Sequence, residues 1–278
     1  MIRLSAFADE ISVSLDEQIA FLNQAGIKWM EIRFVDGKNI TTLTDEEVMD
    51  VKSRLDKASI GISAIASPIG KYAIDAPFEN HLALLRRTIR IAKMLNASMI
   101  RIFSFYGGEN RCIDDCGEEV VSRLKAFAEE VKGTGIRLVH ENEAGIFGHS
   151  ATNCEYLMNH LYSDNFKAAY DPANFVWGEK IIDNINTCWP LIKRFTSHIH
   201  IKDWKLGSKD VGALPGDGDG QIPELFKELA SMEYDGFVTL EPHMSSGGQF
   251  AGETTPAQYN AAIAKVRTYC MDNGIIYE

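Results

Sequence analysis

Residues 197–202 read SHIHIK, a stretch that alternates polar and apolar side chains. Side chains on a β-strand point alternately to its two faces, so the two histidines and the lysine share one face and the two isoleucines share the other. The isoleucine face is suited to packing against helices. The ionisable face must then point toward the interior of a sheet that is covered on its outer side, and this arrangement is typical of a closed barrel.

Seven further runs of β-forming residues occur along the chain, each bounded by turn residues and separated from the next by an amphipathic stretch. Alternating strands and helices favour parallel pairing through right-handed crossovers. The predicted strands are 2–8, 29–34, 60–66, 98–103, 136–141, 167–171, 197–202 and 236–241. The predicted helices are 15–25, 45–57, 79–95, 118–131, 153–161, 181–192, 222–230 and 256–271.

Eight such units in 278 residues indicate an α/β protein with a single (β/α)8 TIM barrel over residues 1–278. An open doubly wound sheet is the competing architecture. It would usually carry a GxGxxG turn after the first strand, but here Phe7 is followed by Ala8-Asp9-Glu10-Ile11-Ser12. The sequence therefore favours the barrel.

The charge balance restricts the kind of partner. There are 28 Lys and Arg against 39 Asp and Glu, a net charge of −11, which opposes binding to nucleic acid or to an anionic membrane surface. No run reaches the roughly 18 apolar residues of a membrane span, and the N-terminus lacks a cleavable signal pattern. We expect a cytoplasmic protein that acts on a small molecule; its oligomeric state, a homo-oligomer included, stays open.

Four successive predicted strands end in a carboxylate or an imidazole, namely Glu141, Asp171, His200 and Glu241. In a TIM barrel the C-terminal ends of the strands face the active site, so these four groups are expected to converge. Three carboxylates in one cavity repel one another unless a cation is present, which predicts one divalent metal ion. Oxygen ligands with a single imidazole favour Mn²⁺, and are compatible with Mg²⁺, Co²⁺ or Zn²⁺.

Other polar residues near these strand ends are candidates for substrate binding. They are Glu31, Lys202, Asp203, Trp204 and His243. Glu31 has an alternative role in an ion pair with Arg33, and Trp204 could simply pack in the core. The predicted loop 207–220 could cap the mouth of the barrel, and its Asp210, Asp217 and Asp219 disfavour a phosphate group.

The motifs SPIGK (67–71), HENEAGIFG (140–148), DPANF (171–175), HIHIKD (198–203) and LEPH (240–243) together resemble the sugar phosphate isomerase/epimerase family of xylose-isomerase-like TIM barrels. The resemblance covers nearly the whole chain. It implies a metal held by Glu141, Asp171, His200 and Glu241, with the two glutamates also transferring protons in epimerase members.

The chain departs from two branches of this family at one position. Asn174 stands where endonuclease-type relatives and most ketose 3-epimerases have a histidine. Together with the net charge of −11, this opposes a role in DNA repair, and it puts the epimerisation of free ketohexoses in doubt.

These features predict a metal-dependent sugar isomerase or epimerase that acts on a keto-sugar or keto-glycoside. Proton transfer by Glu141 and Glu241 would proceed through a metal-stabilised enediolate. Two alternatives stay open at this point. One is a metal-dependent dehydratase of a keto-polyol such as a keto-inositol, and the other is a barrel that binds sugar without turnover.

Overall fold

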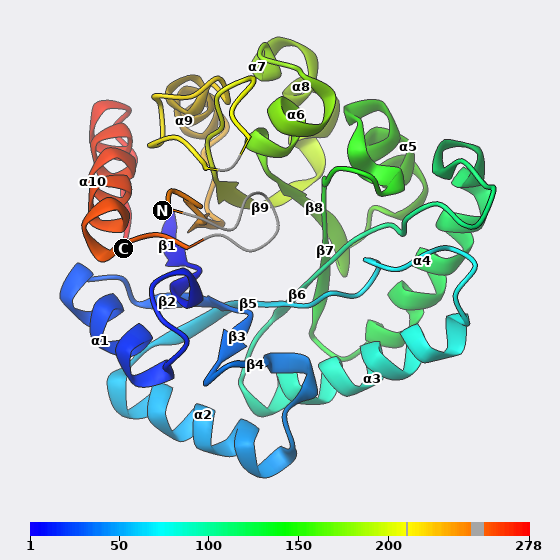
Figure 1. Cartoon of the computed structure of the whole chain (residues 1–278), viewed down its shortest axis with the longest axis horizontal. Coiled ribbons are helices and arrows are strands. Elements are labelled where there is room, and N and C mark those ends of the chain that lie inside the picture. Colours follow the sequence, from blue (N-terminus) through cyan, green and yellow to red (C-terminus); the bar gives the residue numbers. More distant parts are fainter. Residues whose placement is uncertain (210, 246–252) are drawn as a thin grey trace.

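The computed structural model describes residues 1–209, 211–245 and 253–278. Within them, eight parallel strands form a closed barrel in the order β1-β10-β9-β8-β7-β6-β5-β2, which confirms the predicted fold (Figure 1). The first strand closes the barrel, because Ser5 of β1 is in register with Trp29 of β2 on one side and with Thr239 of β10 on the other. The strands are β1 (Arg3–Ala6), β2 (Trp29–Ile32), β5 (Gly61–Ala66), β6 (Met99–Ile102), β7 (Arg137–Glu141), β8 (Phe166–Tyr170), β9 (Thr196–Ile201) and β10 (Phe237–Leu240).

Helices surround the barrel, as Figure 1 shows. Their ends carry the expected signals; for example, α2 begins with a capping box in which Thr44 and Glu47 exchange hydrogen bonds. The helices are α1 (Leu15–Ala25), α2 (Asp45–Ala58), α3 (Phe78–Met94), α4 (Gly117–Val131), α5 (Ala151–Leu161), α6 (Pro172–Glu179), α7 (Asn184–Thr187), α8 (Trp189–Ile192), α9 (Ile222–Ser231) and α10 (Pro256–Asp272). None of the helices in the described ranges is long and apolar enough to cross a membrane.

The predicted helix 181–192 is wrong. The chain instead enters α6 directly after β8, because Asp171 caps the helix and Pro172 fills its first position, where a missing N–H is harmless. Two single-turn helices, α7 and α8, follow. Pro190 lies near the start of α8, and a continuous helix could not pass through it without losing a backbone hydrogen bond.

The interior of the barrel is layered. Ala64, Met99, Val139, Ala169 and Phe237 form a small apolar cluster. Polar groups of the strands occupy the same interior beside this cluster; for example, the hydroxyls of Ser5 and Ser63 lie 2.7 Å apart. The large apolar core lies between the strands and the helices, and it includes Ile199 and Ile201, as the alternation in β9 predicts.

A short hairpin that the sequence analysis did not predict follows β2. It consists of β3 (Phe34–Val35) and β4 (Lys38–Asn39), paired antiparallel. Asp36 and Gly37 connect the two strands with φ angles of 50° and 77°. Two residues with positive φ form the type I′ turn that suits a two-residue hairpin loop. In Figure 1 the hairpin lies inside the ring of helices, near β5.

Candidate metal centre and active site

The structure brings Glu141, Asp171, His200 and Glu241 together at the C-terminal ends of β7 to β10. All four are buried, and one ligand atom from each lies within 4.8 Å of the others. They come from four neighbouring strands, because β7, β8, β9 and β10 pair in sequence around the barrel. A single ion could therefore contact all four side chains.

His200 is oriented by Glu31 from within the barrel. Its Nε2 lies 3.1 Å from Oε2 of Glu31, whereas its Nδ1 lies 3.0 Å from Oε1 of Glu141 and 3.6 Å from Oε2 of Glu241. Glu31 also contacts Nε2 of His198 at 2.6 Å. Burial alone would raise the pKa of Glu31, but the two histidines more than offset this and hold it below its usual value. An ionised Glu31 accepts a hydrogen bond from Nε2–H, so Nδ1 is the nitrogen that faces Glu141 and Glu241.

The two carboxylate oxygens of Asp171 contact different groups. Oδ1 accepts hydrogen bonds from the backbone N–H groups of Ala173 (2.8 Å) and Asn174 (3.2 Å) and thereby caps α6. Oδ2 lies 2.8 Å from Nζ of Lys202. Burial raises the pKa of Asp171 to about 7, even though the Lys202 ammonium opposes the increase. A divalent cation near Oδ2, in addition to this ammonium, would keep the buried carboxyl ionised at neutral pH.

Glu241 is held through one oxygen. Nη1 of Arg33 donates to its Oε1 at 2.9 Å, and Nε2 of His243 lies 3.3 Å from the same atom. Oε2 is buried and accepts no hydrogen bond from the described residues. Burial would raise the pKa of Glu241, but Lys202, His243 and Arg33 bring it well below its usual value.

Glu141 has a matching arrangement on the other side of the site. Its Oε2 accepts a hydrogen bond from Nη1 of Arg101 at 2.7 Å, and its Oε1 faces His200. The guanidinium of Arg101 stacks on Phe103, 4.5 Å from the ring centre. Burial would raise the pKa of Glu141, but His200 and Arg101 outweigh it and lower the pKa below its usual value.

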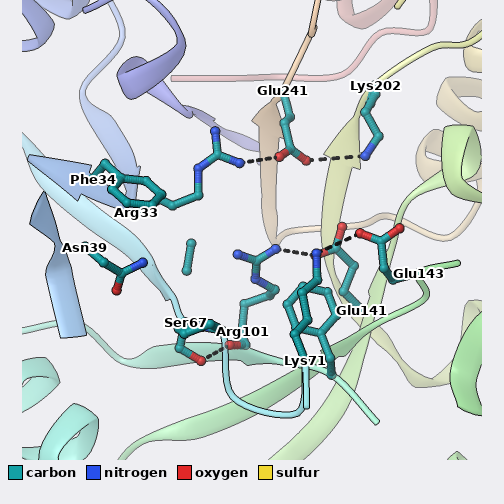
Figure 2. Close-up of a pocket in the computed structure, with 13 residues that line it drawn as sticks. Arg33, Phe34, Asn39, Ser67, Lys71, Arg101, Glu141, Glu143, Lys202 and Glu241 are labelled. Carbon is teal, nitrogen blue, oxygen red and sulfur yellow. Dashed lines mark hydrogen bonds and ion pairs between the residues drawn. The ribbon is translucent and has the colours of Figure 1, made fainter. Parts of the chain in front are cut away.

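A cavity of about 150 Å³ opens beside these carboxylates (Figure 2). Two of the predicted metal ligands, Glu141 and Glu241, line it together with Lys202. The other lining residues come from the C-terminal ends of β5 and β6 and from the segments that follow β2, β5, β6 and β7. Figure 2 shows Arg33 reaching from the hairpin side toward Glu241, and Lys71 paired with Glu143. The lining residues are Arg33, Phe34, Asn39, Ala66, Ser67, Pro68, Lys71, Arg101, Phe103, Glu141, Glu143, Lys202 and Glu241.

The donor set fits a divalent cation. Three buried carboxylates and one imidazole face a common point, and the buried Oε2 of Glu241 lacks a hydrogen-bond donor there. Nζ of Lys202 lies 3.8 Å from this oxygen, and a buried carboxylate oxygen without a hydrogen-bond donor is unfavourable unless a closer cation or donor reaches it. The same four residues are those that the strand ends predict; their role as metal ligands stays a prediction.

Comparisons with known proteins agree with this geometry. Residues 19–269 match the family model described as Xylose isomerase-like TIM barrel. The chain belongs to this family. No curated protein matches the sequence.

Solved structures of the xylose isomerase-like fold superpose over almost the entire chain. The 3-keto-D-glucoside 4-epimerase of E. coli has a TM-score of 0.73 and 16% identity, covering 96% of this chain and 100% of that one. The probable 3-DHS dehydratase AsbF of Bacillus anthracis, involved in petrobactin synthesis, has a TM-score of 0.75 and 15% identity, with 96% and 99% covered. A xylose isomerase-like TIM barrel protein of Mycobacterium smegmatis in complex with magnesium has a TM-score of 0.73 and 13% identity, with 98% and 96% covered.

Of the five residues expected to bind substrate in this xylose isomerase-like barrel, Lys202 is the one that lines the cavity. Glu31 lies beneath the site, against His198 and His200, and does not pair with Arg33, which contacts Asp9 and Glu241 instead. His243 lies behind Glu241, between it and Glu10. Glu31 and His243 are not among the residues that line the cavity, and their role in substrate binding stays a prediction.

Asp203 and Trp204 also face away from the cavity. The Asp203 carboxylate accepts hydrogen bonds from the backbone N–H groups of Trp204, Gly216, Gly218 and Gly220. Trp204 is 1% exposed and packs against Ala173 and Val176 of α6. Both residues therefore stabilise the loop after β9. For Trp204, this is the packing role that the sequence analysis gives as an alternative to substrate binding.

Asp217 and Asp219 of the predicted capping loop are not among the residues that line the cavity. Asp217 contacts Nζ of Lys265 at 3.2 Å, and Asp219 accepts from the backbone N–H of Leu206 at 2.7 Å. Asp210 lies outside the described residues.

Several residues that line the cavity carry no role in the sequence analysis, namely Phe34, Asn39, Lys71, Arg101 and Glu143. Arg101 offered a usable signal, because an arginine inside the short apolar strand MIRI needs a partner in the barrel. Lys71 and Glu143 belong to the SPIGK and HENEAGIFG motifs, but only the fold shows that they form an ion pair (3.0 Å).

Proposed function

We propose that this protein is a divalent-metal-dependent sugar isomerase or epimerase that acts by proton transfer on a keto-sugar or keto-glycoside. One observation carries the proposal. Glu141 and Glu241 each have one oxygen held by an arginine and the other turned toward a point that they share with Asp171 and His200. The superposition on a 3-keto-D-glucoside 4-epimerase supports the substrate class.

The four ligands would bind about one divalent ion per chain. When bound, such an ion supplies positive charge that stabilises an enediolate. The donor set favours Mn²⁺, and Mg²⁺ is also compatible, as in the complex of the Mycobacterium smegmatis neighbour.

The two glutamates are placed to act on a substrate from different sides. β7 carries Glu141 and β10 precedes Glu241, and two strands of the barrel separate them. His200 and Arg101 keep Glu141 ionised, and Lys202, His243 and Arg33 do so for Glu241; an ionised carboxylate can accept a proton. One glutamate removes a proton from the carbon beside the carbonyl, and the other returns a proton to the opposite face or to the adjacent carbon.

Lys202 supplies a positive charge that stays in place during proton transfer. Burial would lower its pKa, but Asp171 and Glu241 raise it far above its usual value, so the side chain remains an ammonium group. In the cavity it can donate a hydrogen bond to a substrate oxygen on which negative charge develops.

The same ammonium group favours a second candidate, a dehydratase of a keto-polyol such as a keto-inositol. Loss of a β-hydroxyl starts with the same proton removal, and Lys202 could donate to the departing oxygen. The superposition on a probable dehydratase supports this alternative. The mass of the product distinguishes the two reactions, since dehydration removes one water.

The decisive experiment is incubation of Mn²⁺-loaded protein in D₂O with a panel of ketoses, keto-glycosides and keto-inositols. We expect deuterium at a single C–H position beside a carbonyl. Glu141→Gln and Glu241→Gln should each lower turnover by about 10² or more, the scale for losing a general base. Glu129→Gln, at an exposed position on α4, is the matched control and should match the wild type.

Three results would contradict the proposal. Conversion without deuterium incorporation would indicate a hydride shift. Near-normal turnover in both active-site variants would exclude the two carboxylates as bases. Absence of exchange with every compound would favour a barrel that binds sugar without turnover.

A further inference from the structure

We propose that Phe34 and Asn39 form a second subsite that binds the ring attached to the reacting sugar, so that the preferred substrate is a keto-glycoside and not a free ketose. This inference rests on the proposed function and specifies its substrate.

The β3–β4 hairpin presents these two side chains as a pair. Phe34 and Asn39 are directly opposite each other in the antiparallel register, and such cross-strand pairs point to the same face of a hairpin. Both line the cavity. The neighbouring pair contains Val35, which is 1% exposed and lies in the apolar core. One face of the hairpin therefore packs in the core, and the other lines the cavity.

The hairpin is fixed in position from several sides. Asp36 in the turn accepts from the backbone N–H of Leu15 at 2.9 Å and pairs with Arg54 at 2.7 Å. Nε2 of Gln18 donates to the carbonyl of Phe34 at 3.1 Å. A rigid platform loses little conformational entropy when a ligand binds, so a contact made there contributes more of its energy to affinity.

The two side chains offer the groups that recognise a sugar or an aromatic aglycone. Phe34 is 41% exposed although it is a large apolar residue, and its ring has no ring partner among the described residues. An aromatic face can pack against an apolar ring face. Thr41 donates to Oδ1 of Asn39 through its backbone N–H and its hydroxyl, at 3.0 and 2.6 Å. This fixes the carboxamide, and Figure 2 shows its nitrogen turned toward the cavity, where it can donate to a hydroxyl.

The place of this pair in the cavity indicates a second ring. The reacting carbon must lie within reach of Glu141 and Glu241, at the other end of the cavity. Figure 2 shows Arg33 between the hairpin and Glu241, so a ring held at the glutamates has this guanidinium beside it. A substituent that points out of the site then reaches Phe34 and Asn39.

Binding and turnover together test the inference. The first measurement is calorimetric binding of methyl β-D-glucoside and phenyl β-D-glucoside to the Mn²⁺-loaded protein. The second is the rate of solvent deuterium exchange with 3-keto-D-glucose and its methyl and phenyl β-glycosides. Phe34→Ala removes the ring, Phe34→Tyr retains it, and Asn39→Ala removes the amide donor. Met49→Ala, at a residue of α2 that is 54% exposed, is the control for loss of an exposed apolar side chain.

We expect the wild type to bind the phenyl glucoside about five- to tenfold more tightly than the methyl glucoside, the scale of one well-packed aromatic contact. Phe34→Ala should reduce this ratio to about twofold or less, whereas Phe34→Tyr and Met49→Ala should retain it. Asn39→Ala should weaken binding of both glucosides by about threefold. Deuterium exchange should likewise be faster with the phenyl glycoside of 3-keto-D-glucose than with the methyl glycoside.

The failures of the two proposals are distinguishable. If the ketoses exchange their protons but Phe34→Ala leaves the preference for the phenyl glycoside unchanged, the subsite is wrong and the proposed function stands. The same conclusion follows if free 3-keto-D-glucose is the best substrate. If no compound exchanges, the proposed function is wrong, and the subsite for a reacting glycoside is wrong with it.

Discussion

Nζ of Lys202 lies 2.8 Å from Oδ2 of Asp171, the oxygen that does not cap α6. The ammonium group thus contacts the atom that Asp171 would offer to a metal ion. Lys202 and the ion are both positively charged, so they compete electrostatically for the same carboxylate.

Replacing Lys202 by Met should therefore strengthen metal binding while it weakens catalysis. We expect the Kd for Mn²⁺ to fall by about tenfold, and turnover to fall by about tenfold or more because the hydrogen bond to the substrate is lost. Calorimetric titration with Mn²⁺ measures the first effect. Lys227→Met, at an exposed position of α9, is the control. Weaker metal binding by Lys202→Met would show that the lysine supports the site and does not compete with the ion.

Glu31 should act on metal affinity through His200. Glu31→Gln replaces the charged acceptor of Nε2 of His200 with a neutral amide. The imidazole is then held less firmly with its Nδ1 toward the other metal ligands. Loss of such an outer partner typically lowers metal affinity by about 10- to 100-fold. Mn²⁺ titration should show this weakening, and His200→Ala should show a larger one. Full-strength binding in both variants would remove His200 from the ligand set.

Gly70, in the SPIGK motif, should be intolerant of any side chain. Its φ is +89°, and a Cβ atom would lie 2.1 Å from the carbonyl oxygen of Phe103. Gly133 is a suitable control, because its φ is +71° and nothing lies within 4 Å of its Cβ position. We expect Gly133→Ala to cost about 1 kcal/mol of unfolding free energy and Gly70→Ala about 3 kcal/mol or more. Urea denaturation measures both; equal losses would mean that the backbone around Phe103 yields easily.

His149 should stabilise the fold only when it is protonated. Its ring nitrogens lie 2.8 Å from Asp114 and 2.7 Å from Glu179. Partial burial would lower its pKa, but these two carboxylates raise it above the usual value of 6.5. A raised folded-state pKa means that the contribution is complete below about pH 6.5 and is lost as the pH rises through the folded-state pKa.

The comparison of wild type with His149→Gln tests this dependence. The wild type should be more stable by about 1 kcal/mol at pH 6, and the difference should shrink toward zero at higher pH. Urea denaturation at several pH values measures it. A difference that grows with pH would show that the neutral imidazole makes the stabilising contacts.

The sequence predicts those features that depend on local periodicity. The alternation around His200 identifies the inward face of β9, and the strand ends indicate which side chains meet. The short helix α6 is absent from the prediction, which ends a strand at Asp171 and begins the next helix at residue 181, although Asp-Pro is a common helix start. Pro190 was the overlooked signal against the longer helix.

The pairings between distant strands could not be predicted. Arg33 and Glu241 are 208 residues apart, and their contact depends on the closure of the barrel between β1, β2 and β10. The contacts of Glu31 with His198 and His200 could not be predicted for a related reason. β2 shifts register against β5 between Met30 and Glu31, and no pattern in the sequence reports this irregularity.

The four backbone hydrogen bonds to Asp203 make two segments at the C-terminal rim of the barrel unequal in their tolerance of sequence changes. At Gly218 and Gly220 a Cβ atom would lie 2.4 and 2.8 Å from the Asp203 carboxylate, so the segment after β9 tolerates little exchange. The hairpin after β2 is instead a small cassette, closed at its base by the hydrogen bond from the N–H of Ile40 to the carbonyl of Arg33. Hairpins of other sequence that keep Val35 and Asp36, which fix this hairpin to the rest of the protein, could be grafted between these two residues without a change in Glu141, Asp171, His200 or Glu241.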